Sequence, residues 1–298
     1  RMHPTLFEGL WHRTRLNDRT ELQGGWIYRV APRGTSKWYH VAESTQIYPT
    51  GRNILGNPSY DGDHQRSLGV FAASAKYRSQ GKVSVTVWDV MVENMFNTAM
   101  AQVEAGDKES PWSVSGMAVH QTTVARGRLA EPEFAYMPNG EDVQAYSARL
   151  RQVLGRFRWQ ANYTRITRHG RYLMPREWGR DPFFTFLPRE RNEGLGDVHA
   201  TTLNLILRDL RPGLRIEMDG GAYWLPPISD ARMNKYAMPS YAQYVLNTQY
   251  QFQGGWKGAA IQLLYLYKMP LFDQDLNERQ AINKVDMHHV NLIFNYAF

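Results

Sequence analysis

The chain has 298 residues, a formal net charge of +7 and no cysteine. The absence of cysteine excludes a disulfide scaffold, a thiolate nucleophile and a cysteine-ligated zinc site. Hydrophobic residues make up 43% of the chain, yet the mean hydropathy is −0.53. No run approaches the roughly 18 to 20 apolar residues that a membrane helix needs, so a helical membrane bundle is excluded. The basic charge leaves nucleic acid, an anionic membrane and acidic solutes as partner classes.

Strict alternation of apolar and polar residues, the period of a β-strand, recurs along the whole chain. It predicts about thirteen strands of roughly ten residues, a length that suits tilted strands crossing a bilayer. The segments start near Phe7, Glu21, Val70, Lys82, Phe96, Trp112, Val143, Ala200 and Gly258, and include residues 156–164, 213–224, 240–253 and 288–298.

The connections between these strands alternate between short and long. The short ones are rich in Gly, Pro, Asp and Asn, as tight turns demand. The long ones cover residues 32–68, 125–141, 167–198, 226–240 and 269–286, and only the connection near 92–95 is short where a long one is expected. This layout is typical of outer-membrane barrels with short periplasmic turns. A soluble β-sandwich is the alternative.

Aromatic residues favour the barrel over the sandwich, because Trp and Tyr cluster near strand ends as in membrane girdles. The last strand, residues 288–298, sets Val290, Leu292, Phe294, Tyr296 and Phe298 on one face, which we expect to meet lipid. Only helices and closed barrels satisfy the backbone in a bilayer. The sequence therefore predicts an all-β fold, a transmembrane antiparallel β-barrel.

The terminal strand that ends in Phe298 looks like the assembly signal of bacterial outer-membrane proteins, and three stretches resemble the OprD family of substrate-selective porins. The stretches are "RMHPTLFEGLW" at 1–11, "ELQGGWIYR" at 21–29 and "KVSVTVWDVMVENMFNTAMAQVE" at 82–104. The resemblance implies a barrel of about eighteen strands, integral to the cell outer membrane, monomeric or homotrimeric, that passes carboxylate-bearing solutes along a ladder of basic side chains. Since about thirteen strands are visible, we expect residues 1–298 to form a single barrel domain that lacks N-terminal strands and the family's inward constriction loop.

Basic residues dominate the strand faces opposite the lipid-facing side chains. Guanidinium groups bind carboxylates through paired hydrogen bonds and stay charged. We predict a solute pathway lined by Arg29, Lys76, Arg78, Arg149, Arg151 and Arg158. For Arg208, Arg211, Arg215 and Lys257, pairing with acidic side chains or headgroups is an equal alternative. A register error of one residue would reverse any of these facings.

Two long loops carry further expectations. Residues 36–67 either fold into the pore and narrow it or cap it from outside. Residues 168–194 are rich in arginine and aromatic residues. We expect this second loop to collect anions at the pore mouth or to bind lipopolysaccharide phosphate, so outer-membrane lipid and lipopolysaccharide are predicted partners alongside small solutes, and nucleic acid is not.

The sequence gives no support for a metal, a cofactor or catalysis. Residues 273–279 begin like a calcium loop, but Glu278 replaces the required glycine and Lys284 occupies position twelve, so an EF-hand is rejected. GxSxG, a phosphate-binding loop and HExxH are missing. We therefore predict a passive porin. The alternatives are a sugar pore with Tyr223 and Trp88 as inward aromatics, an outer-membrane lipid hydrolase, and a soluble basic protein that binds nucleic acid.

Overall fold

The computed structural model describes residues 4–48, 50–59, 65–106, 110–272, 276–282 and 284–297. Within these ranges fourteen strands form one antiparallel sheet, with the two-residue β3 beside β2. The strands are β1 (Leu6–Asn17), β2 (Thr20–Ala31), β3 (Tyr39–His40), β4 (Val70–Arg78), β5 (Val83–Val92), β6 (Phe96–Ala105), β7 (Trp112–Thr123), β8 (Asp142–Leu154), β9 (Phe157–Ile166), β10 (Val198–Arg208), β11 (Leu214–Trp224), β12 (Tyr241–Gln251), β13 (Ala259–Pro270) and β14 (Met287–Tyr296).

The helices are single turns: η1 (Glu43–Gln46), η2 (Gly127–Ala130), η3 (Gly254–Trp256) and α2 (Glu278–Ala281). No helix in the described ranges is long and apolar enough to cross a membrane. The thirteen long strands are those that the alternating pattern predicts, and the predicted all-β fold is confirmed.

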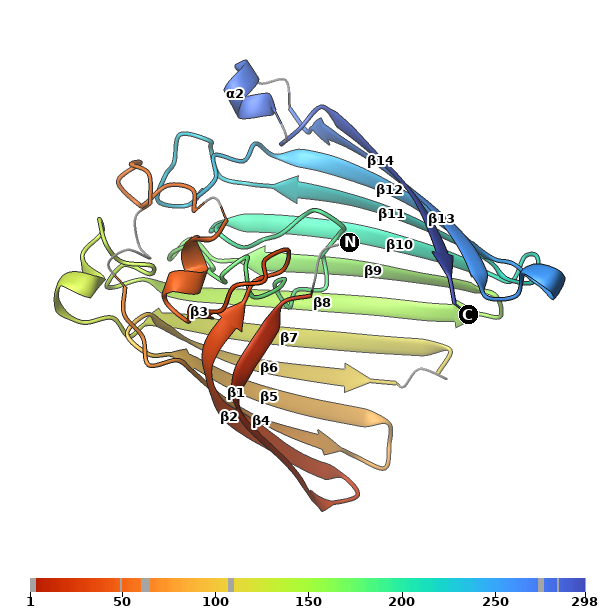
Figure 1. The fold of residues 1–298 in the computed structure, drawn as a ribbon, viewed down its shortest axis with the longest axis horizontal. Coiled ribbons are helices and arrows are strands. Elements are labelled where there is room, and N and C mark those ends of the chain that lie inside the picture. Colours follow the sequence, from red (N-terminus) through yellow and green to blue (C-terminus); the bar gives the residue numbers. More distant parts are fainter. Residues whose placement is uncertain are drawn as a thin grey trace.

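Apart from β3, each strand pairs with its neighbours in the sequence, as tight turns on one side require. Glycines at positive φ make two of these turns possible: Gly155 (φ 57°) between β8 and β9, and Gly213 (φ 84°) before β11. A Cβ at Gly213 would lie 2.3 Å from the Gln251 carbonyl oxygen, so the turn also needs the missing side chain. The tight turns fall at one end of the sheet and the long connections at the other, where the short connection between β5 and β6 also lies (Figure 1).

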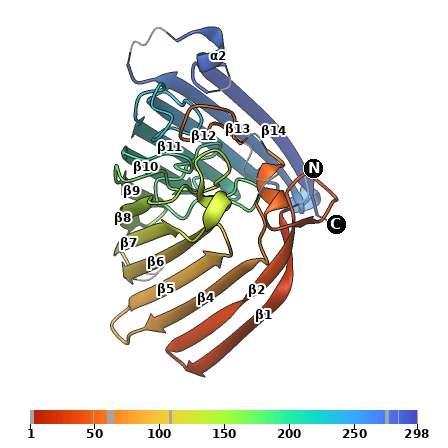
Figure 2. The same cartoon turned by 90° about the vertical axis from the view of Figure 1, so that its left-hand side faces the viewer.

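The sheet curves into an open trough with β1 and β14 at its two edges (Figure 2). The long connections gather at one end, and several of them lie on the concave side (Figure 2). Directly paired residues of neighbouring strands share a face, so the register assigns every strand residue to the concave or the convex side.

The convex face carries large apolar side chains, and they belong to the strand faces that the sequence predicts to meet lipid. On β14, Val290, Leu292 and Phe294 pair with Tyr265, Leu263 and Ile261 of β13, and Leu292 is 70% exposed. Phe298, the terminal residue of this predicted face, lies outside the described residues. Exposed apolar side chains on the convex face are the arrangement that a surrounding bilayer requires.

The buried core lies between the concave face and the long loops. Leu173, Phe183 and Leu187 come from the loop between β9 and β10, and they belong to the same buried cluster as Tyr223 and Val119 of the strands. The core therefore forms inside the trough, and it holds a loop against the wall.

Candidate functional site

Basic side chains gather on the concave wall toward the short turns of β4, β8 and β9. The register places Arg78 of β4, Glu104 of β6 and Arg149 of β8 in one cross-strand row that passes through Ser84 and Ser115. Because the period of a strand is two, Arg151 lies on the same face as Arg149. The predicted facing of these arginines is therefore the facing that they have.

These side chains line a hollow of about 760 Å³. Its basic members are Lys76, Arg78, Lys82, Arg149, Arg151 and Arg158. Glu104 is the acidic residue among the described lining residues, and the remaining side chains are small or neutral and polar, such as Ser113 and Gln160. The hollow therefore has a strong excess of positive charge on one wall.

Arg149 is held in place by neighbours on two sides. Its Nε donates to Asn162 Oδ1 at 3.1 Å, and Asn162 Nδ2 donates in turn to Thr202 Oγ1 at 2.9 Å. The guanidinium lies 4.1 Å from the centre of the Phe184 ring. Asn162 and Phe184 orient the guanidinium without neutralising it, so its charge stays available to a solute.

A second, smaller hollow of about 230 Å³ shares Arg158 and Gln160 with the first. It also contains two carboxylates, Glu217 and Asp219, and both accept hydrogen bonds from Asn204. Arg215 forms an ion pair with Glu217 at 2.9 Å. This is the acidic pairing that the sequence leaves open for Arg215. Arg158 lines both hollows, so it lies where the basic hollow adjoins these carboxylates.

The connection between β9 and β10, residues 167–197 and here called the plug loop, folds into the trough. Leu173 and Gln121 exchange two hydrogen bonds of 2.8 Å, and the Phe184 N–H donates to Ser147 Oγ at 3.1 Å. The plug loop therefore contacts β7 and β8 on the concave side, and it narrows the space above the basic hollow.

Contacts on the opposite wall hold the second half of the plug loop. Tyr223 of β11 donates its hydroxyl to the Thr185 carbonyl oxygen at 2.6 Å. Gln243 of β12 donates to the Pro188 carbonyl oxygen at 2.9 Å. Lys268 of β13 forms an ion pair with Glu190 at 2.6 Å, and its Nζ lies 3.7 Å from the centre of the Tyr241 ring.

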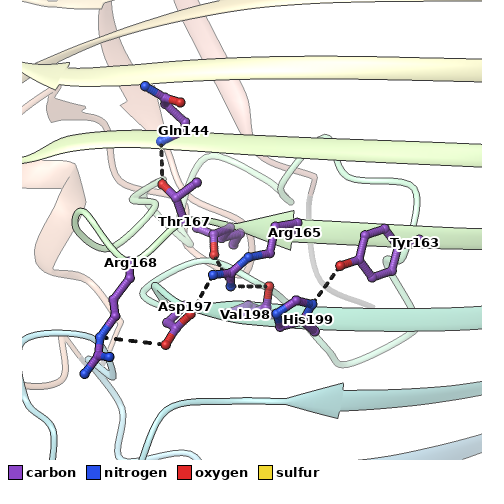
Figure 3. A network of polar contacts seen from close by, with 9 residues as sticks. Gln144, Tyr163, Arg165, Thr167, Arg168, Asp197, Val198 and His199 are labelled. Atoms are coloured by element: carbon purple, nitrogen blue, oxygen red, sulfur yellow. Dashed lines mark hydrogen bonds and ion pairs between the residues drawn. The ribbon is translucent and has the colours of Figure 1, made fainter.

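The two ends of the plug loop are fixed to each other by a polar network (Figure 3). Arg165 donates to Asp197 at 2.7 Å and to the Val198 carbonyl oxygen at 3.2 Å. Arg168 lies 3.8 Å from the same Asp197 carboxylate. The Asp197 N–H donates to the Thr167 carbonyl oxygen at 3.1 Å. These contacts hold the two ends of the loop together at the point where it leaves and rejoins the sheet.

Buried carboxyl groups lie inside the plug loop. Burial raises the pKa of Asp181 to about 6, although the backbone N–H groups of Asn192 and Phe183 donate to it. The Asn192 bond to Oδ2 is 2.8 Å, and Oδ1 has no hydrogen-bond partner among the described residues. Burial also raises the pKa of Glu177, which accepts the Tyr48 N–H at 2.8 Å.

The expectation that residues 168–194 collect anions at the pore mouth is wrong for its central arginines. Arg171 is buried and donates to the carbonyl oxygens of Arg52 and Ala231. Arg176 pairs with Glu193 at 3.2 Å and stacks on Tyr236. Because the guanidinium N–H groups of these arginines donate to carbonyl oxygens and to Glu193, the arginines fix the loop inside the trough.

The other long loop supports the plug loop. In residues 36–67, Ser44 and Thr45 are buried, and Ser44 accepts a hydrogen bond of 2.7 Å from Trp178. Arg52 donates to the carbonyl oxygens of Ile228 and Asn234. The described residues of this loop therefore pack against the plug loop and against residues 226–240, and its role in narrowing or capping the pore stays a prediction.

The structure brings together five of the six predicted pathway residues. Arg29 is the exception: it lies near the other end of its strand, pairs with Glu8 at 3.5 Å and does not line the 760 Å³ hollow. Sequence reasoning missed the plug loop as the partner of this wall. Phe184 and Glu190 sit in a segment without strand periodicity, and only the density of aromatic and charged residues there gave a signal.

Alternative chemistries find little support in the described residues. No group of three or more metal-ligating side chains occurs among them. Tyr223, a predicted inward aromatic, is buried beneath the plug loop. His120 and Asp142 lie 2.8 Å apart on the convex face. The register pairs His120 with Ala99 and Gln144 and pairs Asp142 with Thr122, and none of these described partners is the serine that a hydrolase triad needs.

Comparisons with known proteins find solved structures of similar fold, whereas comparisons of sequence find no match. No family model matches the chain, and neither does any curated protein sequence. Among solved structures, OccK3 (OpdO) of Pseudomonas aeruginosa is 15% identical with a TM-score of 0.72, covering 98% of this chain and 69% of that one. OccAB4 of Acinetobacter baumannii is 14% identical with a TM-score of 0.71, covering 98% and 65%.

A third solved structure, Pseudomonas aeruginosa OpdK with vanillate, is 13% identical with a TM-score of 0.68, covering 98% of this chain and 69% of that one. The chain thus spans about two thirds of the length of these proteins. They are outer-membrane porins of the OprD family. The chain has the fold of the OprD-family outer-membrane porins, as the resemblance in its sequence predicts.

Proposed function

We propose that the protein is an outer-membrane porin through which small anionic solutes, chiefly carboxylates, diffuse passively past the basic hollow. The observation that carries the proposal is the convergence of Arg149, Arg151 and Arg158 with Lys76 and Arg78 on one stretch of the concave wall, around a single hollow of about 760 Å³. A solute that follows this wall exchanges one guanidinium partner for the next without a large change in free energy.

The chemistry of the wall favours carboxylates over neutral solutes. Six arginine and lysine side chains of the hollow can supply charge-assisted hydrogen bonds, and arginine offers two parallel donors to a carboxylate. OpdK, one of the proteins with the same fold, was crystallised with vanillate, an aromatic carboxylate. A sugar pore needs exposed lumenal aromatics. Of the two inward aromatics that the sequence predicts, Tyr223 is 1% exposed, and only Trp88 of β5 is partly exposed on the concave face.

The plug loop would set the size limit of the pore. Phe184 contacts Arg149, and Arg180 of the same loop lies 4.6 Å from the Phe186 ring at the edge of the second hollow. A solute leaving the basic hollow therefore meets plug-loop side chains next. Size exclusion and charge selection then act at adjacent positions.

Reversal potentials in planar bilayers under a salt gradient test the proposal. We expect discrete conductance steps with anion preference. In the triple variant Arg149→Gln, Arg151→Gln, Arg158→Gln, the ratio of anion to cation permeability should fall several-fold, because the charges removed line the pathway.

The matched control removes three charges outside the hollow: Arg126→Gln, Arg211→Gln and Lys257→Gln. None of these residues lines the 760 Å³ hollow, so its reversal potential should stay that of the unaltered protein. Equal shifts in the two triple variants would refute a pathway along this wall. A bilayer without conductance steps would refute the porin itself.

A further inference from the structure

One carboxylate lies among the cations of the basic hollow. Glu104 of β6 lines the hollow together with six lysine and arginine side chains. The register places it between Ser84 of β5 and Ser115 of β7. The arginines of the same cross-strand row, Arg78 and Arg149, lie two strands away on either side. Two short hydroxyl side chains therefore separate the carboxylate from the cations that could neutralise it.

Glu104 differs in this respect from every other carboxylate of the strands. It has neither a hydrogen bond nor an ion pair with any described residue, although it is only partly exposed. Each of the six others has a side-chain partner: Glu8 and Arg29, Glu21 and Arg13, Asp89 and Asn97, Asp142 and His120, Glu217 and Arg215, Asp219 and Asn204. Glu104 is thus the strand carboxylate that no contact with the described residues explains.

The free carboxylate acts on whatever occupies the hollow. Its negative charge lowers the positive potential that the surrounding cations create, and it repels each negative charge of a solute. A pathway must bind a solute strongly enough to admit it and weakly enough to release it. A wall of six cations without a counter-charge would favour entry at the expense of release.

We propose that Glu104 is a specificity-determining residue of the pathway, a counter-charge that limits the attraction of the hollow and lowers its preference for solutes with two or more negative charges. The inference rests on the proposed function, because it takes anions to pass along this wall. Glu104 weakens binding by one factor for each negative charge of the solute, so a dianion is weakened by about the square of that factor. Carboxylates with a single negative charge are therefore the solutes that leave the hollow most readily.

Block of the ion current by butyrate and succinate tests this role in planar bilayers. The two acids have carbon chains of equal length, but butyrate carries one negative charge and succinate carries two at neutral pH. In Glu104→Gln, the Kd for block should fall about threefold for butyrate and about tenfold for succinate, as Coulomb's law gives for charges about 10 Å apart, or two strand spacings, in a water-filled pore. Each succinate block should also last longer by a similar factor.

Three further variants separate charge from shape. Glu104→Asp keeps the charge and should keep both Kd values close to those of the unaltered protein. Glu133→Gln removes the same charge at an exposed loop position outside the hollow and should change neither. Ser84→Asp adds a carboxylate beside Glu104 in the row and should raise the Kd of succinate more than that of butyrate. This variant tests the same inference if Glu104→Gln fails to insert.

The outcomes separate this role from the porin proposal. If the unaltered protein conducts with anion preference but Glu104→Gln changes neither Kd, or changes both by the same factor, the role of Glu104 is refuted and the porin stands. Weaker block by succinate in Glu104→Gln would also refute it, because Glu104 would then help to bind the solute. If the unaltered protein gives no conductance steps, the proposed function fails and the role of Glu104 fails with it.

Discussion

On the β4 to β8 stretch of the concave wall, basic side chains border an open hollow, whereas on the β11 to β13 stretch the polar side chains are covered by the plug loop. Arg78 and Arg151 line the open hollow. Lys268 is 2% exposed and is paired with Glu190. The same curved sheet thus uses charge in two ways: unburied cations can attract a mobile solute, and a buried ion pair fixes a piece of the protein.

Removal of an open charge and removal of a buried charge have different consequences. An open guanidinium is solvated with or without a solute, so its loss changes selectivity and leaves the fold intact. A buried charge that loses its partner keeps the penalty of desolvation without the compensating attraction. Substitutions on the two stretches should therefore change different measured quantities.

The largest effect on the covered stretch should come from Lys268→Met. The change leaves the buried Glu190 without its cation. The free energy that holds the plug loop in the trough should fall by about 3 to 5 kcal/mol. Hydrogen exchange of residues 186–193 should accelerate strongly, and open-pore current should become larger and noisier. The exposed control Lys257→Met should match the unaltered protein.

A double variant sharpens this result. Lys268→Met with Glu190→Gln removes both charges, so most of the lost protection should return. If the single and the double variant exchange at the same rate, the ion pair does not hold the plug loop.

A smaller effect, and one that depends on pH, should come from Asp181. Its pKa is raised from 3.8 to about 6 in the folded loop, so the folded state binds the proton more tightly than the unfolded state. The folded plug loop is therefore most stable below about pH 4. Its stability falls as the pH rises from about 4 to about 6 and is constant above that range. The difference of about 2 pKa units corresponds to about 3 kcal/mol at most.

Asp181→Asn should therefore flatten the pH dependence of hydrogen exchange in the plug loop between pH 4 and 6. A residual slope of the same sign should remain, because burial also raises the pKa of Glu177 and Glu141. Glu133→Gln, at an exposed loop position, is the control. A variant with the full slope of the unaltered protein would show that Asp181 is not the group that titrates.

The open stretch of the wall could be predicted from the sequence because its information is local. A period of two gives the face of each strand residue, so Arg149 and Arg151 could be assigned to the concave side without any tertiary contact. Periodicity does not show, however, how far along the pore axis a residue lies. The sequence therefore groups Arg29 with the others, although Arg29 lies by Glu8, away from the hollow.

The covered stretch could not be predicted because its contacts join distant segments. Glu190 and Lys268 are 78 positions apart, and Tyr223 and Thr185 are 38 apart. The plug loop has no repeating pattern that would indicate a buried face. Its arginines resemble a solvated anion-binding surface in the sequence, and only the surrounding carbonyl oxygens show that Arg171 is a buried structural residue.

The smallest effect on the covered stretch should come from Tyr223→Phe. The tyrosine ring stacks on Tyr241 with centroids 4.6 Å apart, and the substitution keeps that contact. Only the hydroxyl bond to the buried Thr185 carbonyl oxygen is lost, which should cost about 1 to 2 kcal/mol. Hydrogen exchange should rise modestly around residue 185 and stay unchanged around residue 173, where Gln121 still holds the loop. Because no charge on the open stretch changes, the reversal potential should be that of the unaltered protein, and a shifted potential would show that the two stretches of the wall do not act independently.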